Sequence, residues 1–320
     1  MAAAVAAAML SGVAAARAAS CVSQGELSAQ DRAALSAVAG QLTQAVFAQD
    51  TGTLRAALLP AEAGAWDGIR GAVEQSADLL KNGRPRLRNL YLLDASMQAA
   101  PADTQFFCTS ANGALTVSIT MQALPPGKYA VILADAEGAP LAGQLGIILA
   151  WDGSAWKLAG LSLRQGSFHG RDGVWYWSRA RTLASGDGWS AWYLYEAAHY
   201  LLLPVDFLSS PNLEKLRQEQ SQVMNGPQAA FPYRIPDGDR TWTVTAVLLD
   251  ASLREPDLAV VYESTGVTDP AAQRTEAIAV LSAFLKSQPG LRQNFHGLWA
   301  VASSGGKHTP VMELPMEKIP

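Results

Sequence analysis

The sequence has few charged residues and only two cysteines, and it contains no cluster of basic residues. Asp, Glu, Lys and Arg make up 16% of the 320 residues and hydrophobic residues 49%, so the chain is too apolar to stay disordered. The net charge is -4 and no run of Lys and Arg occurs, which argues against nucleic acid as a partner. Beyond the N-terminal segment no apolar run reaches the length of a membrane span, so we predict no transmembrane span in the mature chain.

The local signatures of common catalytic and metal sites are also missing. The four histidines form no His-x-x-x-His pair, which is one spacing typical of zinc sites. No Gly-x-Ser-x-Gly elbow, Walker-type phosphate loop or Gly-x-Gly-x-x-Gly segment occurs. We therefore predict no metal and no cofactor, and we favour a non-enzymatic protein over an enzyme.

The N-terminal segment indicates the compartment. Residues 1–16 are almost entirely small and apolar, and Ala16-Arg17-Ala18 has the small-x-small pattern that a signal peptidase cuts. We interpret residues 1–18 as a signal peptide. The mature protein would then be exported, to the periplasm or the extracellular space.

The two cysteines, Cys21 and Cys108, both lie after this cleavage point. An even number of cysteines in an exported chain favours a disulfide between them. The alternative is a lipid anchor on Cys21, because Ala18-Ala19-Ser20-Cys21 resembles a lipobox. We favour the disulfide, since Cys108 would otherwise remain unpaired.

The spacing of apolar residues changes along the chain and predicts an α+β protein. Helical spacing predicts helices over residues 28–50, 53–59 and 66–80. A period of two then predicts an antiparallel meander, with turn residues such as Asn112-Gly113 and Asp152-Gly153 between the runs. The predicted strands cover residues 88–96, 105–109, 115–122, 129–135, 145–151 and 156–163.

The second half of the chain has a different pattern. An aromatic-rich stretch predicts a hairpin of two helices followed by a third, and the order strand, strand, helix, strand comes after a loop-rich connection. A polar, Pro-containing segment ends the chain, and we expect it to be flexible. The predicted parts are an α+β roll at 19–165, a helical bridge at 166–225, a small α/β domain with ββαβ order at 226–304 and a flexible tail at 305–320.

Two resemblances to known proteins refine this outline. The segment from Ala45 to Pro60, followed by a helix and a meander ending at Trp156-Lys157-Leu158-Ala159-Gly160, resembles the nuclear transport factor 2-like, or cystatin-like, roll over about residues 28–165. That resemblance implies a curved sheet wrapped around a long helix, with a cone-shaped pocket used for catalysis, small-ligand binding or protein contacts. Residues 168–177 and 203–211 are similar to exported bacterial proteins of unassigned function, which implies secretion and a two-part layout.

One loop concentrates proton-transfer and charged groups. In His169-Gly170-Arg171-Asp172, His169 is a candidate general base oriented by Asp172, and Arg171 is a candidate anion ligand. The alternative is structural, with Asp172 capping the following helix and Arg171 pairing with a carboxylate. We favour the structural interpretation.

The remaining candidates are aromatic or lie on a strand. Trp175 opens the aromatic stretch, which is either a ligand platform or, as its helical spacing favours, core. Tyr91 and Asp94 lie on a strand that would border the pocket of a roll, where ketosteroid-isomerase-like proton transfer is conceivable. We predict an exported, non-enzymatic binding protein whose partner is a protein or a small apolar ligand; the alternative is a pocket enzyme that performs isomerase- or hydrolase-like proton transfer.

Overall fold

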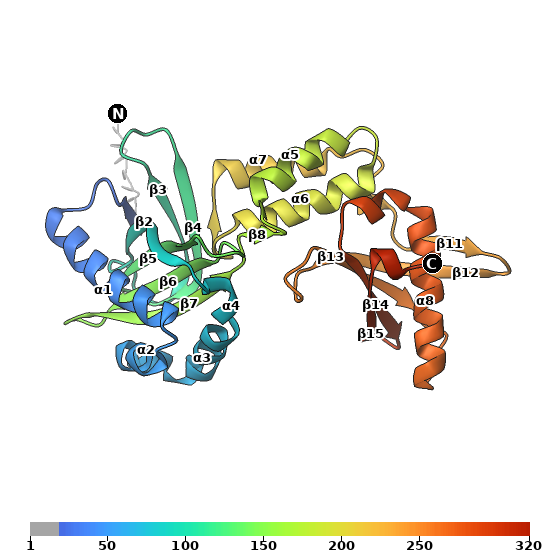
Figure 1. The fold of residues 1–320 in the computed structure, drawn as a ribbon. Coiled ribbons are helices and arrows are strands. Elements are labelled where there is room, and N and C mark those ends of the chain that lie inside the picture. Colours follow the sequence, from blue (N-terminus) through green and yellow to red (C-terminus); the bar gives the residue numbers. More distant parts are fainter. Residues whose placement is uncertain (1–18) are drawn as a thin grey trace, which may run out of the picture.

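A computed structural model describes residues 19–320, which fold into helices and sheets as the predicted α+β class requires. The predicted signal peptide, residues 1–18, lies outside the described residues. Two parts that each contain a sheet are joined by a helical segment (Figure 1). Within residues 19–320, no helix combines the length and the apolar character needed to cross a membrane.

Helices open the N-terminal part of the chain, as the apolar spacing predicted. Side-chain caps begin the first two: Asp31 N donates to Ser28 Oγ at 3.0 Å, and Thr53 N donates to Asp50 Oδ1 at 3.0 Å. The predicted helix over 66–80 is broken at Ser76 into two. The helices are α1 (Ala29–Phe47), α2 (Thr51–Ala57), the 3-10 turn η1 (Pro60–Ala65), α3 (Trp66–Gln75) and α4 (Ala77–Leu80).

All six predicted strands of the first half form, but they divide between two sheets. One sheet has the order β1-β2-β5-β6-β7 and the other the order β10-β4-β3, with antiparallel pairing throughout; β10 (Leu208–Ser209) comes from the helical segment. The short first strand was not predicted. The strands are β1 (Ser20–Ser23), β2 (Arg84–Asp94), β3 (Ala102–Thr109), β4 (Thr116–Leu124), β5 (Lys128–Glu137), β6 (Gln144–Trp151) and β7 (Trp156–Arg164).

The central strand β5 is buried on both faces because each face has its own core. Ala130 and Ile132 contact the core that packs against the helices, whereas Val131 and Leu133 contact the core between the two sheets. Period-two alternation places successive side chains on opposite faces. The small β10-β4-β3 sheet therefore covers the face of the main sheet that the helices leave open.

The predicted disulfide between Cys21 and Cys108 is confirmed. Cys21 lies on β1, opposite Leu93 of β2, and Cys108 lies on β3, where it is 2% exposed. The bond therefore joins the main sheet to the small sheet. Because the Cys21 sulfur is used in this bond, it is not free to carry a lipid, and the structure favours the disulfide over the lipid anchor.

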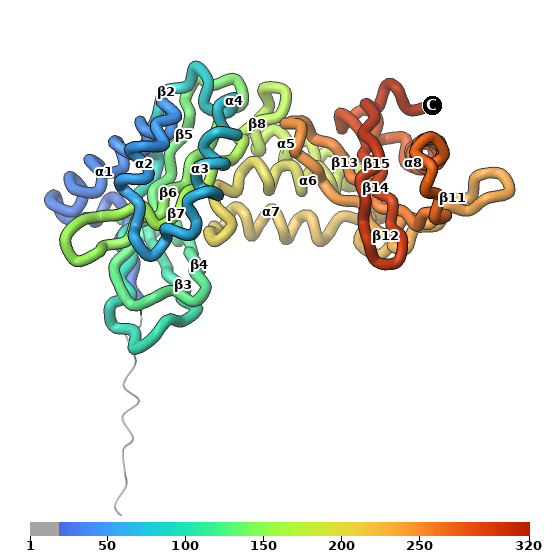
Figure 2. Tube along the Cα trace, turned by 90° about the horizontal axis from the view of Figure 1, so that it is seen from below, coloured from blue at the N-terminus to red at the C-terminus, as the bar shows by residue number. Residues whose placement is uncertain are grey.

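The helical segment, which we call the bridge, contains the predicted hairpin and third helix. The aromatic stretch belongs largely to the core, as its spacing predicted. Four of its residues are buried and three more are partly buried against the same core: Tyr176, Trp189, Tyr193 and Tyr195, and then Trp177, Trp192 and Tyr200. In both views the bridge lies between the two sheet-containing parts (Figures 1 and 2). Its elements are β8 (Ser167–Phe168), β9 (Arg171–Asp172), α5 (Gly173–Leu183), α6 (Gly188–Leu202), β10 (Leu208–Ser209) and α7 (Pro211–Ser221).

The C-terminal part has the predicted strand, strand, helix, strand order with one further strand at each end. Its sheet has the order β11-β12-β13-β14-β15, and α8 crosses between the parallel pair β13 and β14. The elements are η2 (Pro227–Ala229), β11 (Tyr233–Asp237), β12 (Arg240–Asp250), β13 (Asp257–Glu263), α8 (Pro270–Ser287), η3 (Pro289–Gln293), β14 (Gly297–Ser304), β15 (Lys307–Pro315) and η4 (Met316–Lys318).

The prediction of a flexible tail at 305–320 is wrong. Residues 307–315 form β15, which pairs antiparallel with β14 along its whole length. The start of this edge strand is exposed and polar, so it lacks the apolar alternation that marks a half-buried strand. Its backbone ladder holds it instead, together with the buried side chains of Met312, Met316 and Ile319. At the end of the chain, Ser282 Oγ of α8 donates to Pro320 O at 3.0 Å.

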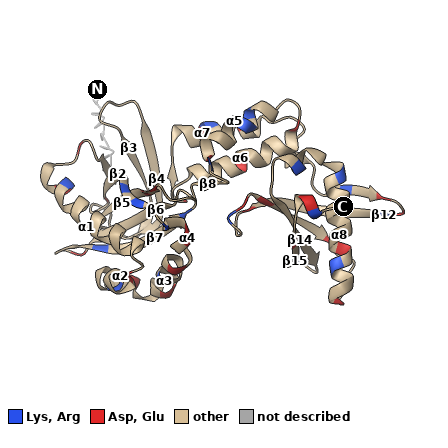
Figure 3. Ribbon diagram, in the orientation of Figure 1, with Lys and Arg blue, Asp and Glu red and all other residues tan. Residues whose placement is uncertain are grey.

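The bridge is attached to both neighbouring parts. Towards the N-terminal part, β10 pairs with β4, and the Gln144 amide donates to the Leu201 carbonyl at 2.6 Å. Towards the C-terminal part, the bridge and the last sheet share one continuous core. Lys and Arg residues and Asp and Glu residues are interspersed along the ribbon of both sheet-containing parts (Figure 3).

A buried carboxylate, Glu276, ties α8 to the end of β13. It is 7% exposed and accepts hydrogen bonds from Thr265 Oγ1 at 2.6 Å, Ser264 Oγ at 2.8 Å and Thr265 N at 3.0 Å. Burial disfavours the charged form, but these hydrogen bonds outweigh burial and lower the pKa of Glu276. The charged form is therefore more stable in the folded than in the unfolded protein.

We expect Glu276→Gln to lower the free energy of unfolding by about 2 kcal/mol at neutral pH, since hydrogen bonds to a charged acceptor are lost. The pKa of Glu276 is lower in the folded than in the unfolded protein. Its carboxylate therefore contributes fully to the free energy of unfolding above the unfolded pKa of about 4.3, and this contribution is lost as the pH falls through the pKa of the folded state. Denaturant unfolding of both proteins at neutral and at acidic pH measures the difference. If Glu276→Gln lowered the free energy of unfolding equally at both pH values, the result would contradict this account.

Candidate functional site

In the predicted loop His169-Gly170-Arg171-Asp172, the first two residues form the turn of the β8–β9 hairpin and the last two form β9. Asp172 caps α5, because Trp175 N donates to Asp172 Oδ1 at 2.8 Å. This confirms the structural interpretation of Asp172, whose carboxylate is engaged at the helix start rather than with His169. The expected pairing of Arg171 with a carboxylate is not found within residues 19–320. Its guanidinium instead lies over the Trp175 ring, 4.1 Å from its centroid, in a cation–π contact.

The partner of His169 is a residue that the sequence pattern did not single out. His169 Nε2 lies 2.6 Å from Glu255 Oε2, in the connection between β12 and β13. His169 also lies near a second histidine, His296, with 6.2 Å between ring centroids. The loop thus contacts the C-terminal part, which sequence spacing alone does not reveal.

A cleft of about 660 Å³ opens between this loop, α5 and the C-terminal part. Its wall combines aromatic rings with basic side chains. Burial raises the pKa of Tyr176 in this wall to about 12, so its hydroxyl is protonated at neutral pH. The cleft is lined by His169, Arg171, Trp175, Tyr176, Arg179 and His296, among others.

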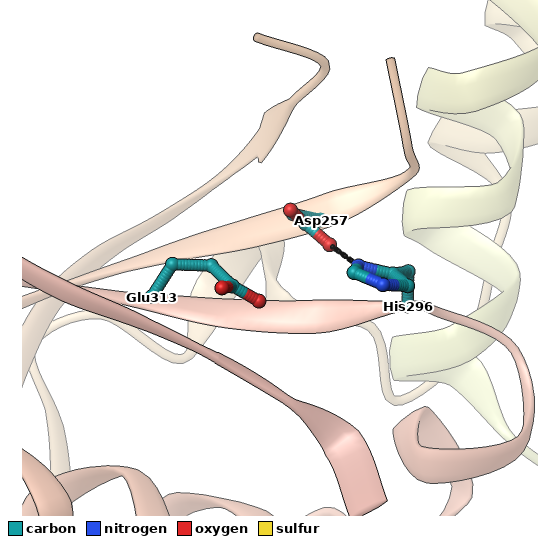
Figure 4. A group of neighbouring side chains, drawn as sticks. All are labelled: Asp257, His296 and Glu313. Atoms are coloured by element: carbon teal, nitrogen blue, oxygen red, sulfur yellow. Dashed lines mark hydrogen bonds and ion pairs between the residues drawn. The ribbon is translucent and has the colours of Figure 1, made fainter. Parts of the chain in front are cut away.

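His296 also belongs to a cluster with two carboxylates, Asp257 and Glu313 (Figure 4). Asp257 is fully buried at the start of β13, and its Oδ1 lies 2.9 Å from Nδ1 of His296, which precedes β14. Glu313 projects from the neighbouring strand β15. One ligand atom from each residue lies within 4.8 Å of the others.

Charges within this cluster influence one another. Burial opposes the charged form of His296, but the hydrogen bond with Asp257 and the charges of Asp257, Glu255 and Glu313 raise its pKa. Burial and the negative charge of Asp257 raise the pKa of Glu313. Local sequence patterns do not reveal this cluster, because Asp257 lies on β13, His296 immediately before β14 and Glu313 on β15, and Asp257 and His296 are 39 residues apart.

The other two predicted site residues, Tyr91 and Asp94, are not brought together. Tyr91 is 7% exposed in the core between the two sheets, and burial raises its pKa. Asp94 lies three residues after Tyr91 on β2. Because side chains alternate along a strand, an odd spacing places Asp94 on the opposite face of the sheet from Tyr91. Asp94 accepts a hydrogen bond from Ser96 N at 2.9 Å. The predicted proton-transfer pair is therefore not assembled.

A larger hollow lies in the N-terminal part. We call this hollow, of about 1040 Å³, the apolar groove; it lies between β4, β5, β6, β7 and the segment that follows α6. The hydroxyl of Tyr129 donates to Pro125 O at 2.8 Å, so its polar end is satisfied by the backbone. Charged side chains, Glu62, Lys128 and Asp206, also border the groove. Its apolar lining includes Met121, Leu124, Tyr129, Ile148, Ala159 and Phe207.

No protein-family model, curated protein or solved structure matches this chain. We therefore infer function from the geometry and chemistry of the two hollows. The wall of the cleft mixes aromatic and basic side chains and borders the cluster of His296, whereas the apolar groove is larger and lined mainly by aliphatic and aromatic side chains. The groove is suited to an apolar molecule.

Proposed function

We propose that this is an exported, non-enzymatic binding protein that holds a small apolar ligand in the apolar groove. The observation that carries the proposal is the groove itself, a hollow of about 1040 Å³ with an apolar lining on a disulfide-linked scaffold. Hollows of several hundred to about 1000 Å³, lined by apolar side chains with a few polar groups, are typical of small-molecule sites.

The lining favours a ligand with an apolar body and a small polar end. Met121 and Tyr129 are buried side chains of the wall, and Ile148 and Ala159 lie on the neighbouring strands β6 and β7. An apolar body that covers them is removed from water, which is favourable in proportion to the apolar area buried. Lys128 and Glu62 border the same hollow and offer charged partners to a polar end.

We propose in addition that the N-terminal part is a cystatin-like roll and that the protein is exported. In a cystatin-like roll, α1 would be the long helix against the sheet, and its buried residues Leu35 and Val46 do pack into a core with Ile132 of β5. The Cys21–Cys108 disulfide supports an oxidising compartment outside the cytoplasm. Residues 1–18 would then be the export signal.

The first experiment is native mass spectrometry of the protein exported to a bacterial periplasm and gently purified. A bound small molecule would support the proposal and identify the chemical class of the ligand. A ligand-free mass, together with no binding of the neutral fluorescent probe N-phenyl-1-naphthylamine, would contradict it.

A substitution that fills the groove should abolish binding of that probe. Ala159→Phe adds a ring at a partly buried position of the lining, and we expect at least a tenfold loss of probe affinity because the ring occupies the ligand volume. The matched control is Ala34→Phe, on the exposed face of α1, which should bind the probe like the unmodified protein. Fluorescence titration measures both. Equal probe affinities for the two variants would show that the probe binds outside the apolar groove.

A further inference from the structure

Three neighbouring strands of the C-terminal sheet bring one imidazole and two carboxylates to one place. Asp257 begins β13, His296 immediately precedes β14, and Glu313 lies on β15. The backbone of His296 is held on both sides, since its N–H donates to Pro256 O at 3.1 Å and its carbonyl accepts from Met316 N at 2.8 Å. The backbone that carries the ring is therefore held by its neighbours in the sheet, and the ring itself contacts Asp257.

Gly297 provides the space in which the two carboxylates approach each other. A Cβ atom at this position would lie 2.4 Å from Glu313 Oε1 and 3.1 Å from Asp257 Oδ1. Any side chain larger than hydrogen would therefore displace the Glu313 carboxylate. The absence of a side chain at Gly297 lets both carboxylates face the same small volume.

Both carboxylates have an oxygen without a partner. Asp257 Oδ2 and Glu313 Oε1 are buried atoms that make no hydrogen bond within residues 19–320, and Asp257 is 0% exposed. A buried carboxylate oxygen without a hydrogen bond or counter-charge is costly, and two adjacent carboxylates repel each other. These two oxygens therefore lack a cationic partner that a bound ion would supply.

We infer that Asp257, His296 and Glu313 bind one divalent transition-metal ion of the zinc type. One nitrogen and two carboxylate oxygens form a donor set that suits Zn²⁺, whereas Ca²⁺ and Mg²⁺ prefer oxygen ligands alone. Their ligand atoms lie within 4.8 Å of one another, so small side-chain rotations bring them to the separations found around a bound ion. Three protein ligands leave a fourth position for water or a ligand.

The site has a route to solvent through the cleft. His296 lines the cleft of about 660 Å³, where Arg171, Arg179 and His169 also lie. An anionic group entering from the cleft would meet both the ion and these basic side chains. This site is separate from the apolar groove, so the failure of one proposal does not decide the other.

The test is calorimetric titration of the chelator-treated mature protein with Zn²⁺, repeated with Ca²⁺. We expect one Zn²⁺ per chain and an affinity for Ca²⁺ at least 100-fold weaker. Glu313→Gln should weaken Zn²⁺ binding at least 100-fold, because loss of a direct ligand costs more than loss of an outer-shell group. The matched control is Glu317→Gln, an exposed carboxylate on η4, which should leave the affinity unchanged.

Thermal unfolding without metal checks that the variants fold. Glu313→Gln removes one of two repelling carboxylates, so we expect the metal-free variant to unfold at a temperature equal to or above that of the unmodified protein. Zn²⁺ should raise the unfolding temperature of the unmodified protein but not of Glu313→Gln. If that variant does not fold, His296→Gln removes the nitrogen ligand and serves in its place. The proposed site would be overturned if the unmodified protein bound no Zn²⁺, or if Glu313→Gln or His296→Gln bound Zn²⁺ as tightly as the unmodified protein.

Discussion

Replacing both cysteines, as Cys21→Ser with Cys108→Ser, is expected to lower the free energy of unfolding by about 4 to 5 kcal/mol. The bond closes a loop with a sequence separation of 87 residues, and cross-linking so long a loop removes much entropy from the unfolded chain. The buried position of Cys108 adds the cost of placing a serine hydroxyl in an apolar core. Denaturant unfolding of the two proteins under oxidising conditions measures the change.

The control for this prediction is the unmodified protein under reducing conditions, which lacks the bond but keeps both side chains. Its loss of stability should approach that of the double variant. Mass analysis before and after reduction should show a gain of two hydrogens. A double variant as stable as the oxidised protein would show that the link contributes nothing to the fold.

The same bond has a consequence for the apolar groove. It joins β1 of the main sheet to β3 of the small sheet, and β3 pairs with β4, which forms one wall of the groove. The spacing between the walls therefore depends on a link that closes only in an oxidising compartment. We expect probe binding to weaken along with stability.

Trp189→Ala is expected to lower the free energy of unfolding by about 3 to 5 kcal/mol, as is typical for truncation of a large buried aromatic side chain. Trp189 of α6 is 7% exposed. Its ring lies 5.1 Å from that of Tyr233, 5.7 Å from that of Phe284 and 5.9 Å from that of Phe231. These rings belong to the C-terminal part, so the substitution weakens the contact between that part and the bridge.

Because the bridge and the C-terminal sheet share one core, we expect them to unfold as one unit. Hydrogen exchange of Trp189→Ala should show reduced protection in α6, α8 and β12 to β14, with less change in α1 and β5. The control is Trp175→Ala on α5, which is 37% exposed and should cost about 1 kcal/mol or less. If protection from hydrogen exchange were lost only in α6, the bridge and the C-terminal sheet would not unfold as one unit.

Local patterns were sufficient to predict most helices and strands. The start of α8 is an example of such a local pattern, because Asp269 accepts from Ala272 N at 2.9 Å and Pro270 occupies the first helical position. With only two cysteines, only one intrachain pairing was possible. The helical spacing of the aromatic stretch also predicted that most of it would be buried. Each of these inferences depends on neighbours in sequence or on simple counting.

Edge strands and pairings across the chain were not predictable in this way. Strand β11 contains Pro236, and β15 begins with exposed polar residues, so neither carries the signal of a half-buried strand. Both form because a neighbouring strand offers unpaired backbone groups. The pairing of β10 with β4 likewise joins segments that are far apart in sequence.

The sequence by itself determined the fold class, the disulfide, the order of most elements and the helix cap at Asp172, because each follows from local spacing, capping chemistry or composition. Only the tertiary structure decided which side chains meet. It separated Tyr91 from Asp94, paired His169 with Glu255, and placed Asp257 beside His296 and Glu313. The physical reason is that strand order and register, which bring distant residues into contact, are set by packing of the whole chain rather than by any local segment.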